Sequence, residues 1–247
     1  SEGFVLKLDA SSGEQLWSSP LRGEILSAPQ SNGKVVVTQT YDGRLHGLDF
    51  ETGAMLWTYD SNLPVLTVRG TSTPILHNDR VYAGFANGRV LAFNALTGAI
   101  EWEVRVAIAQ GRSEIERIVD IDGTMELAGS ELYAASYQRR RHTWVLINGG
   151  PGSGIHKTTD GGRSWTKLSS GLPGTDMGRI GLAIAQQEPS TVYAIIEAAE
   201  NKGGFFRTQN GGMTWSKMSK VVIGRIITCL ISHVVCCSCC RMTALTG

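Results

Sequence analysis

The sequence has almost no charge imbalance, no cysteine before residue 229 and no acidic residue after Glu200. Its 23 basic and 22 acidic residues leave a formal net charge of +1. This balance gives no electrostatic argument for nucleic acid or an anionic membrane surface as a partner. The first ten residues, SEGFVLKLDA, hold neither a basic cluster nor an apolar stretch. We therefore expect no signal peptide there, and the sequence begins within a repeat.

The C-terminal residues 220–247 differ in composition from everything before them. All five cysteines lie between Cys229 and Cys240. Five is an odd number for a disulfide framework, and the CCSCC run lacks the paired C-x-x-C spacing of a zinc site. The apolar run VVIGRIITCLISHVV is interrupted by Arg225 and His233, and it is too short for a membrane span of about 20 residues. A shifted reading frame or a sequence-assembly artefact is the favoured explanation, with palmitoylation and metal capture as alternatives.

Three 15-residue segments align without a gap and define an internal repeat. They are GFVLKLDASSGEQLW (3–17), GRLHGLDFETGAMLW (43–57) and GRVLAFNALTGAIEW (88–102), with starts 40 and 45 residues apart. Short strand-like segments with turn residues between them at this period are typical of four-stranded propeller blades, and not of a helical solenoid. The sequence therefore predicts an all-β fold, a β-propeller of about five blades that is partial or chimeric.

Each shared position of this repeat has a physical role. The opening glycine favours a tight turn, the Asp or Asn six residues later can accept hydrogen bonds from turn amides, and a second glycine closes the hairpin. The repeat ends on a tryptophan, whose large ring can wedge between neighbouring blades. We predict this blade-docking role, and not ligand binding, for Trp17, Trp57 and Trp102.

The repeat resembles the PQQ-type repeat of quinoprotein propellers. The connecting stretches LPVLTVRGTSTPI (63–75), GRSEIERIVDID (111–122) and LYAASYQ (132–138) narrow this resemblance to the BamB family. Members of that family are propeller lipoproteins of the outer-membrane β-barrel assembly machinery in Gram-negative bacteria. The resemblance covers about residues 3–138 and implies a position on the periplasmic side of the outer membrane. Membrane association would then come only through the assembly complex or a lipidated N-terminus that this sequence lacks.

The connections at 63–75 and 111–122 each follow the last strand of one blade and precede the first strand of the next, so they should emerge on the same rim. Long connections on a rigid scaffold often carry binding residues. The resemblance implies that this rim docks onto a POTRA domain of a BamA-type partner. The partner-binding residues that the resemblance implies are Leu66, Val68, Arg69, Asp120 and Asp122. The alternative is that Arg69 pairs with one of the aspartates inside the propeller and only orders the connections.

No set of residues in this half indicates catalysis, a metal or a cofactor. His46 and His77 stand alone at repeat positions without a second ligand at metal spacing, and we interpret them as turn or surface residues. A bound quinone would need polar ligands from several blades around a central cavity, and the sequence shows no such set. We expect a protein that is not an enzyme and holds neither a metal nor a cofactor.

A different repeat follows Gln138. The segments GIHKTTDGGRSWTKLS (154–169) and GFFRTQNGGMTWSKMS (204–219) align without a gap, 50 residues apart. Each carries an Asp-box, S/T-x-D-x-G-x-S/T-W, and resembles the BNR repeats of sialidases, xyloglucanase-like glycosidases and sortilin-type propellers. The Asp or Asn of this box should bond turn amides, the glycine should adopt positive φ, and the tryptophan should pack beneath. These structural residues are Asp160, Gly162, Trp165, Asn210, Gly212 and Trp215.

The sequence thus predicts three parts: PQQ-like blades over 1–138, Asp-box blades over 139–219, and the unrelated tail 220–247. Whether the blades close a ring stays open. A retaining glycosidase needs two carboxyl groups about 5–5.5 Å apart, and the few acidic residues after Gln138 suggest no such pair. A non-enzymatic scaffold is the leading hypothesis. The alternatives are a secreted Asp-box glycosidase or glycan-binding module, and a fusion artefact with no function of its own.

Overall fold

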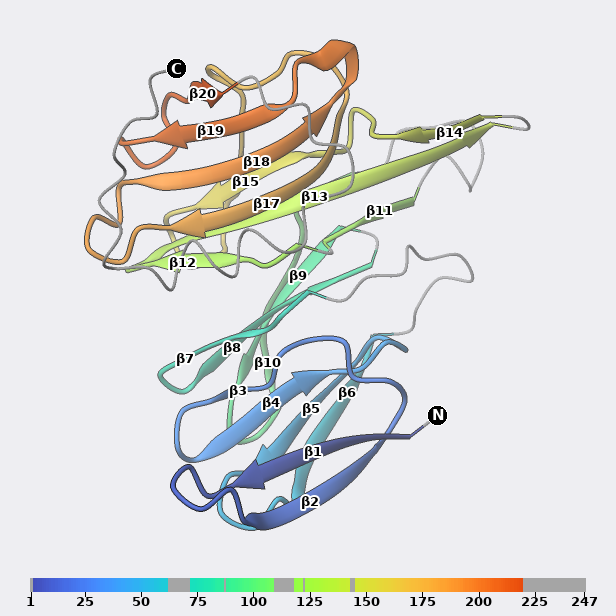
Figure 1. The fold of residues 1–247 in the computed structure, drawn as a ribbon, viewed down its shortest axis with the longest axis vertical. Helices are drawn as coiled ribbons and strands as arrows, with labels where there is room; N and C mark the ends of the chain where they lie inside the picture. The colour runs from blue at the N-terminus through green and yellow to red at the C-terminus, as the bar shows by residue number, and fades with distance from the viewer. Residues whose placement is uncertain are drawn as a thin grey trace.

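The computed structural model describes residues 2–61, 72–86, 88–108, 118–121, 123–142 and 145–219. These residues form five antiparallel sheets that follow one another along the chain (Figure 1). Helical structure among them is limited to one short 3-10 turn, Ala199–Asn201. The predicted all-β propeller architecture is confirmed. The predicted tail, 220–247, lies outside the described residues.

The first three sheets come from the PQQ-like repeat. The N-terminal sheet has only two strands, β1 (Glu2–Leu8) and β2 (Gln15–Arg22). The second sheet consists of β3 (Gln30–Ser31), β4 (Val35–Gln39), β5 (Arg44–Asp49) and β6 (Met55–Asp60). The third sheet consists of β7 (Ile75–His77), β8 (Arg80–Phe85), β9 (Arg89–Asn94) and β10 (Ile100–Arg105). Strands in the second and third sheets pair in chain order.

The fourth sheet is built around one long strand, β13 (Glu131–His142), which continues through the predicted boundary at Gln138. Near its start β13 pairs with β12 (Glu126–Ala128) and β15 (Gly154–Thr158), and near its end it pairs with β11 (Ile118–Asp120) and β14 (Val145–Asn148). The sheet ends on β16 (Thr166–Leu168). Strands from both repeat types therefore share one sheet.

The fifth sheet has four strands in chain order. They are β17 (Met177–Ile184), β18 (Val192–Ala198), β19 (Gly204–Thr208) and β20 (Ser216–Ser219). Figure 1 shows the N-terminal and C-terminal sheets at opposite ends of the longest axis. The first and last described sheets are therefore not packed on each other.

The turn that precedes the last strand of each PQQ-like sheet is built the same way three times. In the second sheet the carboxylate of Asp49 accepts hydrogen bonds from the backbone N–H and the hydroxyl of Thr52, both at 2.8 Å. These bonds lower the pKa of Asp49. Gly53 then takes a φ of +71°, which a residue with a β-carbon rarely adopts. Asp9 and Asn94 accept the equivalent bonds in the first and third sheets.

One β-bulge recurs in all three PQQ-like sheets, just before the tryptophan. In the second sheet Trp57 pairs with Gly47 and Met55 pairs with Leu48, so Leu56 is the extra residue. Leu16 and Glu101 occupy the same place in the first and third sheets. A bulge bends the strand and redirects its side chains. The extra residue consequently points outward while the tryptophan that follows turns toward the next sheet.

Apolar clusters fill the space between successive sheets. Between the second and third sheets, Val35, Leu45 and Trp57 pack against residues that include Leu91 and Phe93. Comparable clusters lie at the other junctions. Burying one such side chain contributes roughly 1.5–3 kcal/mol, so these clusters are the main source of stability.

Candidate partner-binding rim

The ends of the two predicted rim connections are joined by a hydrogen bond. Ser72 follows the undescribed residues 62–71, and its hydroxyl donates to the carbonyl of Gly123 at 3.1 Å. Ser72 is 1% exposed, so this bond is shielded from water. Because Gly123 directly follows Asp122, the first connection ends where the second does. The two connections therefore meet on the same rim at this point.

The second connection is also fastened to the end of β8. Asp120 forms an isolated β-bridge with Ala86, and the N–H of Ile121 donates to the carbonyl of Phe85 at 3.2 Å. Gly84 makes room for this approach, since a β-carbon there would collide with the side chain of Ile121. The rim is thus held by backbone contacts between the third and fourth sheets.

The structure gives Asp120 a buried position. Its exposure is 5%, and its backbone pairs with Tyr137 in β13. This burial leaves little of its carboxylate surface for a partner. Leu66, Val68, Arg69 and Asp122 lie outside the described residues, so their contact roles stay predictions.

The described part of the rim carries two arginines, each placed by acidic neighbours. Arg44 bonds Asp42 at 2.7 Å and Asp60 at 3.0 Å. Arg89 bonds Glu103 at 2.8 Å and the carbonyl of Ser61, where the first connection begins, also at 2.8 Å.

An exposed apolar side chain follows directly on the segment that bonds next to Arg89, where the N–H of Ala107 donates to the carbonyl of Gly88. Ile108, directly before the undescribed residues 109–117, is 69% exposed. An exposed apolar residue among oriented charges is suited to protein recognition. No sequence pattern marks Ile108, since a lone isoleucine next to a connection is not distinctive.

Each repeat tryptophan reaches into the following sheet. The indole N–H of Trp17 donates to the carbonyl of Phe50 at 3.0 Å, and that of Trp57 donates to the carbonyl of Ala95 at 2.8 Å. A β-carbon at Gly53 would collide with the ring of Trp17, and one at Gly98 with the ring of Trp57. The third ring, Trp102, lies in the same way over the Asp-box glycine Gly162. The contact between the two repeat types thus repeats the contact within the first type.

The two Asp-boxes form matching turns. Asp160 accepts hydrogen bonds from the hydroxyl of Ser164 and from its backbone N–H, the latter at 2.9 Å, and these bonds hold the pKa of Asp160 well below the usual range. Asn210 accepts from the N–H of Thr214 at 3.0 Å. Gly162 and Gly212 have φ of +96° and +88°. The indole of Trp165 donates to the carbonyl of Gly162, and Trp215 is buried at 4% exposure.

The interpretation of His46 as a turn or surface residue is wrong. His46 is 4% exposed, and its ring lies between the hydroxyls of Thr40 and Thr58 at 3.3 and 3.1 Å. The ring is buried because β5 is an inner strand, covered by the preceding sheet. Burial lowers its pKa. His77 is exposed at the end of β7, as expected.

The described residues contain no cluster of three or more histidine, cysteine or acidic side chains that could hold a metal ion. In the same part of the chain, no helix is long and apolar enough to cross a membrane.

A family model described as "Outer membrane protein assembly factor BamB", built on PQQ-type repeats, matches residues 1–202. The chain belongs to the BamB family. The match passes beyond Gln138 and includes the first Asp-box, whereas the second Asp-box lies after it. The resemblance of residues 139–219 to the BNR group stays a prediction from the sequence.

Curated BamB proteins agree with this membership. Outer membrane protein assembly factor BamB of Nitrosomonas eutropha is 34% identical over 148 residues, which are 60% of this chain and 36% of the relative. The BamB protein of Pseudomonas aeruginosa is 51% identical over 81 residues, 33% of this chain and 21% of the relative. The matched part thus spans about a third or less of these relatives.

Solved structures support the fold. BamB from Moraxella catarrhalis superposes with a TM-score of 0.60 at 24% identity, covering 88% of this chain and 71% of that one. A quinohemoprotein alcohol dehydrogenase from Comamonas testosteroni superposes with a TM-score of 0.56 at 14% identity, and the match covers 78% of this chain and 34% of the dehydrogenase. At these identities the likeness concerns the propeller fold that the BamB family shares with quinoproteins, and not their chemistry.

Proposed function

We propose that this chain is a non-enzymatic propeller scaffold of outer-membrane protein assembly, acting on the periplasmic side, and that its rim binds a POTRA domain of a BamA-type partner. Family membership supports the assembly role. The observation that carries the choice of surface is the bond from Ser72 to Gly123, because it joins the two connections that the family resemblance singles out.

Within this proposal the rim residues have two different roles. Asp120, buried beside Ala86 and Tyr137, positions the second connection. Arg69 and Asp122 supply charge to the partner, with Leu66, Val68 and the exposed Ile108 as apolar anchors. Oriented charges around apolar anchors favour fast and specific association with a partner of complementary charge.

The Asp-box enzyme is the less favoured function. The Asp160 carboxylate is committed to its own turn through Thr158 and Ser164. A glycosidase would need a second carboxyl group held at a defined distance from a free one. The Asp-box turns instead act as blade-to-blade contacts in this proposal.

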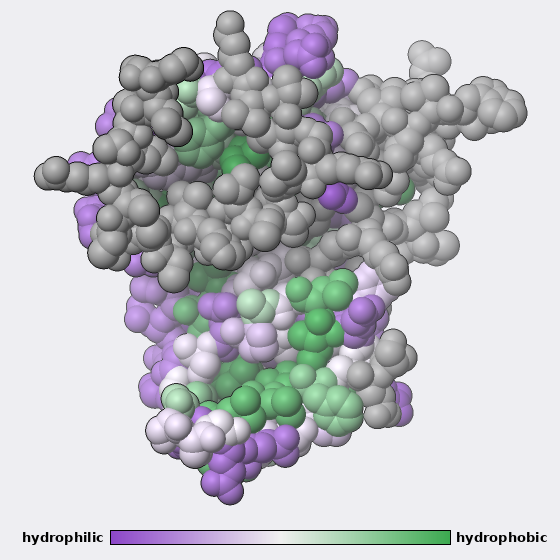
Figure 2. Space-filling view, in the orientation of Figure 1, coloured by the Kyte–Doolittle hydropathy of each residue, from purple (hydrophilic) through white to green (hydrophobic). Residues whose placement is uncertain are grey.

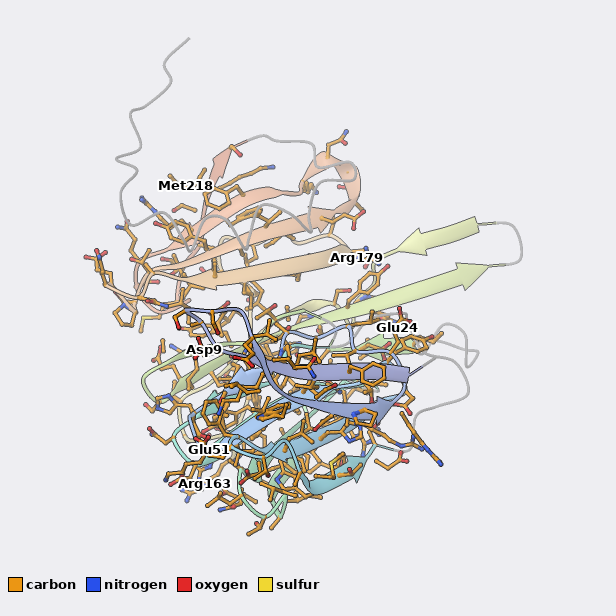
Figure 3. The ribbon with its side chains drawn as sticks, turned by 60° about the horizontal axis from the view of Figure 1, so that its bottom comes forward. Asp9, Glu24, Glu51, Arg163, Arg179 and Met218 are labelled. Carbon is orange, nitrogen blue, oxygen red and sulfur yellow. The ribbon has the colours of Figure 1, made fainter. Side chains whose placement is uncertain are left out.

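Binding of the full chain to purified POTRA domains of a BamA-type protein, measured by biolayer interferometry, tests the proposal. Charge reversals Arg69→Glu and Asp122→Lys should each weaken affinity about tenfold or more, which corresponds to ~1.4 kcal/mol. Arg163→Glu is the matched control, since Arg163 lies on the side of the molecule opposite Glu24, which belongs to a connection of the same kind as the rim (Figure 3).

Asp120→Asn separates the two roles. It should lower the midpoint of thermal unfolding more than Asp122→Lys does. Unchanged affinity in both charge reversals, with folding intact by circular dichroism, would count against the rim as the binding surface.

A further inference from the structure

A cavity of about 280 Å³ lies between the fourth and fifth sheets. Its walls come from β12 and the turn that follows it, and from the end of β17 and the turn at 185–191. β12 pairs with the start of β13, whereas β11, which holds Asp120, pairs with its end. The cavity and the rim therefore lie at different ends of the fourth sheet (Figure 1).

The walls of the cavity combine one carboxyl group with apolar surface. Glu126 is the only titratable residue among those that line the cavity, and Gln186 adds a side-chain amide. Leu127, Ile184 and Pro189 supply apolar surface. Sites for small ligands typically have such walls, mostly apolar with a few polar groups that orient the ligand.

The carboxyl group of Glu126 has no basic side chain beside it in the part of the chain that the structure describes. Burial raises its pKa to about 7, and a hydrogen bond from the backbone N–H of Ile184 opposes this shift only in part. A carboxylate removed from water is stabilised by an opposite charge. At neutral pH Glu126 is therefore divided between a protonated form and an ionised form that lacks a counter-ion.

Two other glutamates in the surrounding segments have partners. Glu131, three residues after β12, bonds Lys157 at 2.8 Å. Glu188, in the turn at 185–191, accepts a hydrogen bond from the hydroxyl of Thr191 at 3.3 Å. Glu126 differs from both, because its carboxyl lines a cavity and has no such side-chain partner among the described residues.

We propose that this cavity binds an organic cation, a primary ammonium group on a short aliphatic chain, with the carboxylate of Glu126 as its counter-ion. The ammonium group has three donors, which suit the Glu126 carboxylate and the amide oxygen of Gln186. The aliphatic chain lies along Leu127, Ile184 and Pro189. A cavity of this volume is at the small end of ligand sites, so it holds a single short chain. A free alkylamine and a lysine side chain of a bound peptide share this chemistry.

Other classes of ligand fit these walls less well. A calcium or magnesium ion takes several oxygen ligands, and the described residues hold no cluster of three histidine, cysteine or acidic side chains. An uncharged apolar ligand would leave the carboxyl group of Glu126 buried without a partner.

The surroundings of the cavity also suit a charged ligand. Gln186 and Pro189 are exposed, so the cavity opens at the turn 185–191. Figure 2 shows apolar residues gathered over the lower part of the molecule, whereas the left edge, where this turn lies in Figure 1, is largely hydrophilic. A cation reaches the opening over polar surface.

NMR titration of the isotope-labelled full chain with n-butylammonium chloride tests the proposal. A primary amine with a pKa near 10 stays charged below pH 8, whereas only the ionised form of Glu126 binds it. With a pKa of about 7, the ionised fraction of Glu126 rises from about 3% at pH 5.5 to about 90% at pH 8, so the affinity should rise about 30-fold. n-Butanol, an uncharged ligand of the same shape, is the control and should show no such rise.

A second arm of the experiment distinguishes the two sources of the ligand. It uses a capped Gly-Lys-Gly peptide in place of the amine. Tighter binding of the peptide than of n-butylammonium would assign the cavity to a lysine side chain of a partner, and tighter binding of the amine would assign it to a small molecule.

Three variants locate the interaction. Glu126→Gln keeps the shape of the side chain and should lower the affinity at pH 8 at least tenfold while removing its pH dependence. Gln186→Glu places a second carboxylate at the opening and should raise the affinity severalfold. Gln187→Glu is the matched control, because Gln187 is an exposed neighbour in the same turn that does not line the cavity, and its affinity should stay close to that of wild type.

Four outcomes would overturn the proposal. The first is that neither the amine nor the peptide binds. The second is an affinity for the amine that does not change between pH 5.5 and 8. The third is wild-type affinity in Glu126→Gln that is folded by circular dichroism. The fourth is a set of shifted resonances that excludes residues 126–129 and 184–189, which would place the ligand elsewhere.

Discussion

Trp57→Ala should remove a large part of the stability of the propeller. The Trp57 side chain is 9% exposed, its ring stacks on Phe93 with centroids 6.1 Å apart, and its N–H bonds the carbonyl of Ala95. Truncating a buried tryptophan to alanine typically costs 3–5 kcal/mol, and the unpaired carbonyl adds about 1 kcal/mol. We expect a loss of about 5 kcal/mol, against a total of about 5–15 kcal/mol for a folded domain.

Urea unfolding followed by tryptophan fluorescence and circular dichroism measures this loss. With a slope of about 2.5 kcal/mol per molar urea, the midpoint should fall by roughly 2 M. Leu56→Ala is the matched control, because Leu56 is the adjacent bulge residue and is 44% exposed. Its cost should stay within about 0.5 kcal/mol. Equal losses in the two variants, or a Trp57→Ala loss below about 1 kcal/mol, would refute the blade-docking role.

Three further predictions follow from buried groups and turns. Burial raises the pKa of Glu126 to about 7. The carboxyl of Glu126 loses its proton near pH 4.5 in the unfolded chain but only near pH 7 in the folded protein. The free energy of unfolding should therefore fall by roughly 3 kcal/mol as the pH rises from 4.5 to 7. Glu126→Gln should abolish this loss in urea titrations at pH 5 and 8. Burial and the charge of Lys167 lower the pKa of His156 to about 4. The contribution of His156 to stability is therefore present above pH 6.5 and lost as the pH falls toward 4. A His156→Gln variant that kept the wild-type acid dependence would contradict this prediction. Gly98→Ala should lower the free energy of unfolding by more than about 2 kcal/mol, because the new β-carbon collides with the ring of Trp57 and the backbone φ is positive. Gly33→Ala also has a positive φ but open space around it, so its loss should be only about 1 kcal/mol. Thermal unfolding compares the two variants.

Much of the fold could be predicted from the spacing of a few residue types. The repeat from Gly43 to Trp57 encodes a turn, a strand, an Asp-centred hairpin and a docking ring, and each of these depends on residues close in sequence. The same holds for the Asp49 turn, which is stabilised by Thr52 three residues later. Local hydrogen bonds and glycine conformations can be read from sequence because they involve so few residues.

Features that depend on contacts between sheets could not be predicted. His46 occupies a repeat position that is apolar in the other copies, and its burial arises only because another sheet covers β5. The pKa of Glu126, the first residue of β12, depends on its burial near Ile184, which lies 58 residues later in the chain. The bond from Ser72 to Gly123 joins a pair of ordinary residues across 51 positions. No sequence pattern marks such pairs.

Hydrogen–deuterium exchange of the full chain, with and without POTRA domains of a BamA-type protein, tests the central claim most directly. The proposed function predicts slower exchange on binding in residues 61–72 and 106–123. It predicts no change in the turns around Asp9, Asp49 and Asp160, which lie at the other ends of their sheets. Protection at those turns, with none at the rim, would contradict the account.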